Sequence, residues 1–171
     1  GFIMQKTTFP IEIIIHDDAS RDNTAEIVMD YEIRYPKIIK PIYQRINQHS
    51  LEIGRVTRLV YTSAAGKYLA ICEGDDYWTD PYKLQKQVDF LENNPDYGLV
   101  HTELDHYYVK KGKYVKNHWL STGVTNQSGD LYNSLLGGGE SMIYTCTVCL
   151  RRELILGMKY ENLPKYMIGD I

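Results

Sequence analysis

A cluster of carboxylates placed between an apolar run and a helix start constrains this chain more than any other segment. Residues 68–72, Tyr-Leu-Ala-Ile-Cys, have the length and composition of a buried strand. Three carboxylates follow within residues 73–76. Asp80 is then placed as a helix N-cap, with Pro81 at the first helical position. The pattern predicts a strand that delivers acidic side chains to its carboxyl end, where open α/β sheets bind ligands.

The three carboxylates are Glu73, Asp75 and Asp76. Packed carboxylates repel one another and are unfavourable unless a cation neutralises them. Oxygen ligands on a tight turn suit Mg²⁺ or Mn²⁺, with a phosphate completing the coordination shell. An acidic surface turn that caps the next helix explains the same spacing, since Asp-Asp turns are common. From this turn alone, both interpretations stay open.

A second acidic turn favours the ligand-binding interpretation. Residues 11–15, Ile-Glu-Ile-Ile-Ile, are typical of a short strand and lead into Asp17 and Asp18, followed by a helix start at Thr24. The carboxyl ends of parallel strands open on one edge, so we expect the two acidic turns to share one pocket. Taken alone, Asp17 is better explained by turn chemistry and by a carboxylate's favourable interaction with a helix N-terminus.

Several segments resemble glycosyltransferase family 2, whose members have the GT-A fold. Residues 9–24, which contain Ile-His-Asp-Asp-Ala-Ser, resemble the second strand of that family. Residues 65–78, which end in Glu-Gly-Asp-Asp-Tyr-Trp, resemble its strand and metal motif, called DXD. Residues 81–91 resemble the helix that follows. The resemblance runs in order over residues 5–100 and is weaker beyond.

The fold class implied by the resemblance is α/β, of the GT-A (Rossmann-like) type, with a mostly parallel sheet flanked by helices. The alternation of strands and helices in the first half predicts the same class. We expect one domain over residues 1–171, with a nucleotide-sugar-binding half at 1–104 and an acceptor-side half at 105–171. Against the family pattern the chain is expected to be truncated at both ends, lacking the first strand and stopping one residue after Asp170.

The hydrophobic periodicity and the breaker residues predict the individual elements. We expect strands at 11–15, 38–44, 68–72, 97–102 and 146–151, helices at 24–35, 52–65 and 81–93, a hairpin within 105–116, a polar loop at 117–129, a short helix at 130–136 and a flexible triple glycine at 137–139.

The resemblance also implies roles for the acidic residues. Asp18 matches the family aspartate that hydrogen-bonds the nucleotide base, and a carboxylate can accept the imide N–H of uracil. Asp17 and Asp75 are expected to join it in nucleotide binding. Asp76 and Asp75 match the metal motif, and Glu73 stands where the family more often has Asp, which leaves its part in the metal site open.

The implied activity is that of an inverting, metal-dependent glycosyltransferase that moves a sugar from a nucleotide-diphosphate sugar, a UDP-sugar being favoured, to an acceptor hydroxyl. A divalent metal, Mn²⁺ or Mg²⁺, is the expected cofactor, and a glycan or lipid-linked acceptor in bacterial surface polysaccharide synthesis is the expected partner. Asp170 lies in a Gly-Asp turn where the family places its general base, although a helix N-cap would look the same. The alternatives are a sugar-phosphate nucleotidyltransferase and a non-catalytic nucleotide-binding domain.

The composition excludes several other classes. The net charge of −3 gives no broad basic surface for nucleic acid. No apolar run reaches membrane-spanning length. Three cysteines argue against a disulfide framework and favour a reducing cytoplasm, so we expect a cytoplasmic protein at the inner face of the membrane.

Two further features have structural explanations that we prefer at this level. Cys146 and Cys149 form a C-x-x-C motif within a predicted strand, where residues three apart face opposite sides, so buried thiols are favoured over a chelate. Fifteen tyrosines would suit a cleft that stacks on sugars or a base, but half-buried strand and helix positions explain most of them.

Overall fold

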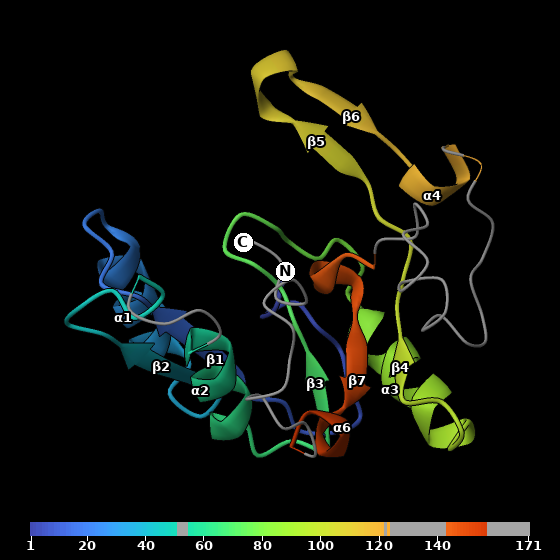
Figure 1. The fold of residues 1–171 in the computed structure, drawn as a ribbon, viewed down its shortest axis with the longest axis horizontal. Helices are drawn as coiled ribbons and strands as arrows, with labels where there is room; N and C mark the ends of the chain where they lie inside the picture. Colours follow the sequence, from blue (N-terminus) through green and yellow to red (C-terminus); the bar gives the residue numbers. More distant parts are fainter. Residues whose placement is uncertain (51–54, 122, 124–142, 157–171) are drawn as a thin grey trace. The chain divides into compact units, whose positions relative to one another are not determined.

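The computed structural model describes residues 1–50, 55–121, 123 and 143–156 (Figure 1). The chain forms two compact units, one of Gly1 with Ala70–Cys149 and one of Phe2–Leu69 with the described residues from Leu150 on. The elements in chain order are β1 (Ile13–Asp17), α1 (Thr24–Arg34), β2 (Ile39–Tyr43), α2 (Arg55–Ser63), β3 (Tyr68–Ala70), α3 (Lys83–Asn93), β4 (Leu99–Val100), β5 (His106–Tyr108), β6 (Lys113–Val115), α4 (His118–Ser121), β7 (Cys149–Arg151) and α6 (Arg152–Leu156), with 3₁₀ turns at Val109–Lys111 and Thr145–Thr147.

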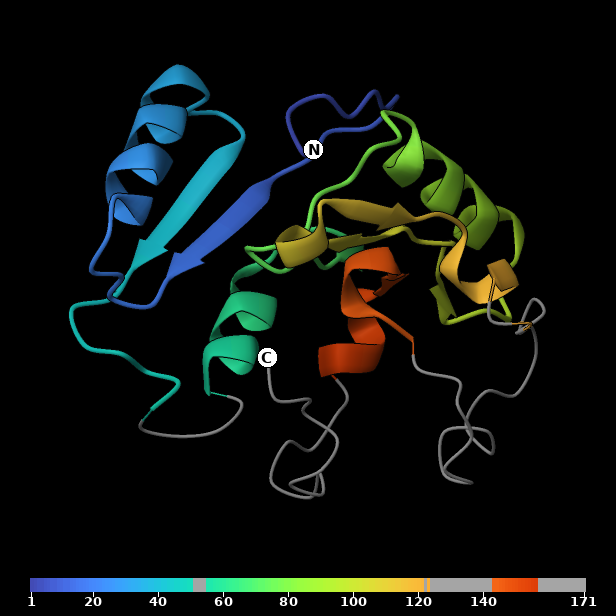
Figure 2. The same cartoon turned by 90° about the horizontal axis from the view of Figure 1, so that it is seen from above.

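The second of these units contains a β–α–β arrangement built from the N-terminal β-branched run. Strands β1 and β2 pair in parallel, with Ile13 opposite Ile39 and Asp17 opposite Tyr43. Helix α1 connects them and lies alongside the pair in both ribbon views (Figures 1 and 2), burying Val28. The expected parallel pairing through a helical crossover is thereby confirmed for these strands.

Strand β1 runs two residues further than the β-branched pattern indicated, which places Asp17 inside the strand. Asp17 is buried, and its Oδ1 accepts a hydrogen bond from the backbone N–H of Ser20 at 3.3 Å. The turn between them holds Ala19 at φ = +62°, in the left-handed region. An L-residue with a Cβ is strained there, so the turn retains this conformation against a local penalty.

Replacing Ala19 with Gly is expected to stabilise the chain by about 0.5–1 kcal/mol. Removing the Cβ relieves roughly 1–2 kcal/mol of left-handed strain, which the greater freedom of Gly in the unfolded chain partly offsets. Urea denaturation of the two proteins measures the difference. Ala25→Gly, inside helix α1, is the matched control and is expected to destabilise by about 1 kcal/mol. Equal destabilisation by both changes would contradict the assignment of strain to Ala19.

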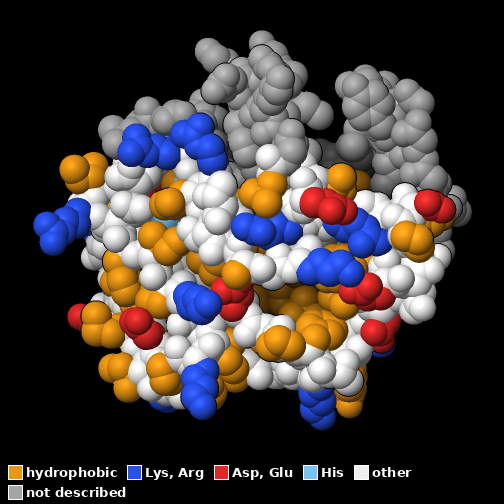
Figure 3. Space-filling model, turned by 90° about the horizontal axis from the view of Figure 1, so that it is seen from below, with side chains coloured by type: hydrophobic (Ala, Val, Ile, Leu, Met, Phe, Trp, Pro, Cys, Tyr) orange, Lys and Arg blue, Asp and Glu red, His pale blue; other side chains and the backbone are white. Residues whose placement is uncertain are grey.

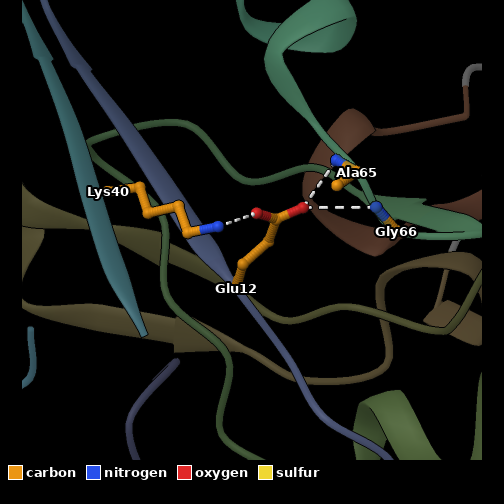
Figure 4. A network of polar contacts seen from close by, with 4 residues as sticks. All are labelled: Glu12, Lys40, Ala65 and Gly66. Atoms are coloured by element: carbon orange, nitrogen blue, oxygen red, sulfur yellow. Dashed lines mark hydrogen bonds and ion pairs between the residues drawn. The ribbon is translucent and has the colours of Figure 1, made fainter. Parts of the chain in front are cut away.

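A network of polar contacts at Glu12 connects the segment after helix α2 to the strand pair (Figure 4). Glu12 Oε2 accepts a hydrogen bond from Lys40 Nζ at 2.8 Å. Glu12 Oε1 accepts hydrogen bonds from the backbone N–H of Ala65 at 2.6 Å and of Gly66 at 3.2 Å. The Lys40 hydrogen bond, together with these N–H groups, holds the pKa of Glu12 below its usual value. The carboxylate thus satisfies backbone donors that follow a helix end and neutralises a neighbouring cation.

A three-stranded sheet has the order β3-β7-β4, so the late strand β7 pairs between two earlier ones. Val148, Cys149 and Leu150, in and just before β7, are all buried, as is Leu91 of α3. Strand β3 is shorter than the predicted 68–72, and β4 is shorter than 97–102. Their expected positions in the chain are nevertheless confirmed.

The predicted hairpin is present as strands β5 and β6, which pair antiparallel. Its connecting turn ends at Gly112 with φ = +57°, a conformation that glycine adopts without strain. Helix α4, by contrast, lies where a polar loop was expected. The carboxylate of Glu103 accepts hydrogen bonds from the N–H groups of Trp119 and Leu120, at 2.9 and 3.4 Å, and so caps this helix from a distant segment. No local pattern indicates such a cap.

The start of α3 also differs from the prediction. The helix begins at Lys83 rather than Pro81, and Asp80 is not its N-cap. Asp80 instead accepts a hydrogen bond from the N–H of Tyr82 at 2.8 Å and pairs with Lys86 at 2.8 Å. The carboxylate therefore organises the turn before the helix.

The charged side chains show no gathering by sign on the face drawn in Figure 3, where basic, acidic and hydrophobic groups are interspersed. Among the described residues, no helix combines the length and apolarity needed to cross a bilayer. The predicted helix at 130–136 and the glycines at 137–139 lie outside the described residues.

Candidate metal and nucleotide site

The acidic turn after β3 forms a three-residue group with a segment far along the chain. Glu73, Asp76 and Cys146 each bring one possible ligand atom to within 4.8 Å of the others. The N–H of Asp76 donates to the carbonyl of Glu73 at 3.2 Å, which closes the turn. Thr145 Oγ1 donates to Glu73 Oε1. The second carboxylate oxygen, Glu73 Oε2, is buried and receives no hydrogen bond within the described part of the chain.

This arrangement fits a divalent cation. A buried carboxylate oxygen without a donor is unfavourable, and a cation at that oxygen would satisfy it. Two carboxylates suit Mg²⁺ or Mn²⁺. A sulfur atom beside them extends the range of metal ions that could bind to softer transition metals. Glu73 and Asp76 are thus the residues that could hold a metal, with Cys146 as a third donor.

Cys146 and Cys149 do not lie in one strand, contrary to the prediction from the sequence pattern. Cys146 lies in the 3₁₀ turn Thr145–Thr147 and not in a strand, because β7 begins only at Cys149. Burial raises the pKa of Cys146 to about 12, with Asp76 and Glu73 adding to the effect, and it raises the pKa of Cys149 to about 11. All three cysteines are free thiols, as expected. Cys146 groups with carboxylates, and Cys149 is a fully buried core residue.

Trp78 holds the acidic turn and the Cys146 segment together. Its side chain is only 8% exposed, and Nε1 donates a hydrogen bond to the carbonyl of Cys146 at 2.8 Å. The buried ammonium of Lys83 lies 4.4 Å from the centre of the Trp78 ring and donates to Gln87 Oε1 at 2.6 Å. Gln87 Nε2 in turn donates to the carbonyl of Thr147 at 2.8 Å. Helix α3 therefore anchors both segments that supply the candidate metal ligands.

The buried Lys83 is expected to make stability depend on pH. Burial lowers its pKa from 10.5 to about 8, so between those values the unfolded chain binds more protons and stability rises with pH. The penalty of burying the charged amine is fully present below pH 8. Relative to a Lys83→Met variant, the wild type should gain about 2 kcal/mol of unfolding free energy between pH 7.5 and 9.5.

Urea denaturation of both proteins at the two pH values measures this gain. The comparison reduces the opposite contribution of Cys72, Cys146 and Cys149, whose raised pKa values destabilise the fold as pH rises above about 9. A constant difference between wild type and variant would mean that Lys83 titrates normally.

The other predicted residues are not members of the three-residue group. Asp75 is exposed and does not belong to the three-residue group. Asp17 is buried at the end of β1, as described above. Asp18 follows in the same turn, and Asp170 lies outside the described residues.

Asp18 is held by the loop that follows β2. Its Oδ1 accepts the N–H of Gln48 at 2.7 Å, and its Oδ2 accepts the N–H of His49 at 2.9 Å. Burial by itself would raise the pKa of Asp18, but these N–H groups and the nearby histidines outweigh burial and lower it. A carboxylate has about four lone-pair positions. Asp18 therefore stays ionised and keeps capacity to accept a further N–H.

Sequence patterning did not indicate Thr145 or Cys146 as neighbours of the acidic turn, nor the anchoring roles of Lys83 and Glu12. The C-x-x-C motif drew attention to Cys146 as a possible metal ligand together with Cys149. Among the described residues, Cys146 groups with Glu73 and Asp76 and not with Cys149. Residues 73 and 145 are far apart in sequence, and only the tertiary structure brings them together.

The sequence model of Glycosyl transferase family 2 matches residues 2–156. The chain belongs to this family. The resemblance and the α/β, GT-A fold class expected from the sequence are thereby confirmed, and the enzyme class that the family defines is the glycosyltransferases.

Three relatives illustrate the range of similarity. An uncharacterized protein of Mycobacterium bovis is 48% identical over 56% of this chain and 27% of its own length. An uncharacterized glycosyltransferase of Nostoc is 29% identical over 90% of this chain and 45% of its own. A UDP-Glc:alpha-D-GlcNAc-diphosphoundecaprenol beta-1,3-glucosyltransferase of Escherichia coli is 29% identical over 95% of this chain and 57% of its own. The chain thus spans between about a quarter and three fifths of the length of these relatives.

Proposed function

We propose that this chain carries the donor-binding part of an inverting, metal-dependent glycosyltransferase that uses a nucleotide-diphosphate sugar. The observation that carries the proposal is the group formed by Glu73, Asp76 and Cys146, in which the buried Glu73 Oε2 receives no hydrogen bond from the residues that the structure describes. It lies on the turn that resembles the family metal motif. A divalent ion bound there would supply Lewis-acid stabilisation of the charge that grows on the departing diphosphate.

We assign the remaining roles to this chain's own residues. The acceptor hydroxyl attacks the anomeric carbon of the donor sugar, the bond from that carbon to the diphosphate breaks, and the hydroxyl proton passes to a general base. Asp170 remains the proposed base. Asp18, with Asp17 and Asp75, remains the proposed nucleotide contact, supported by the lowered pKa of Asp18 and by the capacity of a carboxylate to accept more than the two N–H groups of Gln48 and His49. One displacement without an enzyme nucleophile inverts the anomeric configuration.

The donor and acceptor proposals draw on the relatives. The name of the Escherichia coli relative specifies UDP-Glc as donor and a diphosphoundecaprenol-linked sugar as acceptor. We therefore propose a UDP-sugar donor, a lipid-linked or glycan acceptor in bacterial surface polysaccharide synthesis, and a cytoplasmic location at the inner face of the membrane.

A thermal-shift panel of UDP, GDP, CMP and dTDP, each with and without Mn²⁺ or Mg²⁺, tests the proposal. At ligand concentrations about 100 times the Kd, UDP with Mn²⁺ should raise the Tm by about 5 °C or more. UDP alone should shift it much less. Absence of any nucleotide effect, or equal shifts with and without metal, would argue against metal-assisted nucleotide binding by this chain.

A further inference from the structure

Three exposed tyrosines lie together beside the acidic turn, all within the unit of Ala70–Cys149. The hydroxyl of Tyr77 lies 3.1 Å from that of Tyr114, and the rings of Tyr107 and Tyr114 are 4.4 Å apart at an angle of 31°. Their exposed fractions are 59%, 46% and 53% for Tyr77, Tyr107 and Tyr114. About half of the surface of each of these three residues is therefore open to solvent. We call this group the tyrosine platform.

The hairpin geometry explains why two of the rings remain uncovered. Tyr107 and Tyr114 are direct partners across the antiparallel ladder and so project from the same face. The next pair, His106 and Val115, faces the other side, where the His106 ring stacks on that of His118 at 4.2 Å. One face of the hairpin thus carries the His106–His118 stack, and the other presents the rings of Tyr107 and Tyr114 beside Tyr77.

We propose that the tyrosine platform is a stacking subsite for a pyranose ring of the acceptor saccharide, an inference that rests on the proposed function above. A pyranose has an apolar face of C–H groups, which packs on the electron-rich face of an aromatic ring. Its hydroxyls need acceptors and donors at the rim, which the phenol groups of Tyr77 and Tyr114 supply.

The position of the platform favours the acceptor over the other possible occupants. Tyr77 follows Asp76 directly, so the platform adjoins the proposed metal and diphosphate site, whereas the nucleotide base is assigned to Asp18. Lys110 and Lys111, which would attract anionic lipid, lie in the connecting turn and not among the three rings. The cluster combines aromatic surface with hydroxyl groups, as a saccharide subsite requires.

The test uses the full chain and a panel of cellobiose, maltose, lactose and N,N′-diacetylchitobiose, with binding followed by saturation-transfer NMR. Tyr107→Ala is compared with Tyr108→Ala, which removes an equally exposed ring, also 46% exposed, from the opposite face of the same strand. At least one disaccharide should receive saturation from tyrosine ring protons, and Tyr107→Ala should weaken its binding by about fivefold or more. Tyr108→Ala should leave it within about twofold, and Tyr107→Phe, which keeps the ring, should retain it.

Circular dichroism establishes that each variant is folded, and Tyr77→Ala, in a loop outside the hairpin, repeats the test without altering the strands. The inference is overturned if no disaccharide binds, if Tyr107→Ala and Tyr108→Ala weaken binding equally, or if the rings bind phosphatidylglycerol vesicles or UMP in preference to saccharide. The UDP and Mn²⁺ thermal shift is measured in parallel. Its absence with saccharide binding intact would refute the proposed donor chemistry, and its presence without saccharide binding would refute the platform alone.

Discussion

Replacing Asp76 with Asn is expected to weaken Mn²⁺-assisted UDP binding by at least about 100-fold. Asp76 supplies one of the three ligand atoms of the candidate metal group. Loss even of an outer-shell partner lowers metal affinity about 10- to 100-fold, so a lost ligand should have a larger effect. Isothermal titration of UDP into the protein, with and without Mn²⁺, measures the change.

Asp75→Asn is the matched control, because Asp75 carries the same side chain one position earlier but lies outside the three-residue group. Its effect should be markedly smaller, and the double variant should lose all dependence on metal. If Asp75→Asn has the larger effect, the ligand assignment within the turn is wrong. Normal metal-assisted UDP binding by the double variant would show that the acidic turn does not bind the metal.

Replacing Trp78 with Ala is expected to destabilise the fold by about 3–5 kcal/mol. The indole is almost fully buried, and its N–H hydrogen bond fixes the Cys146 carbonyl. The change would leave a cavity beneath the acidic turn and leave that carbonyl without its donor. Trp78→Phe keeps much of the ring volume and should cost less than the Ala change. Urea denaturation midpoints and slopes give the free energies of unfolding.

Tyr82→Ala is the control for Trp78, since it removes a large aromatic side chain that is 46% exposed from a nearby position. It should cost under about 1 kcal/mol. Comparable losses at Tyr82 and Trp78 would mean that the indole is not the anchor of this turn. We also expect Trp78→Phe to weaken Mn²⁺-assisted UDP binding more than its small stability change would suggest, because the Cys146 segment would lose its fixed position.

The sequence by itself determined the family, the α/β class and the order of most elements. These depend on local information: the β-branched run of β1, the apolar run of β3, the periodicity of α1 and α3, and Gly112 at the hairpin turn each favour one conformation over short distances. The two acidic turns are equally local, so Asp17, Asp18, Glu73, Asp75 and Asp76 could be named before any coordinates.

The tertiary structure decided which of those acidic residues act together and with what. Cys146 joins Glu73 and Asp76, while Asp75 stays outside the group, because the segment before β7 packs against the acidic turn through Trp78. Glu103 caps helix α4 from a distant segment, which no local pattern could indicate. Likewise, the burial of Lys83 and the exposure of the tyrosine platform depend on contacts between residues far apart in sequence. The hydrophobic periodicity of the sequence carries no information on such contacts.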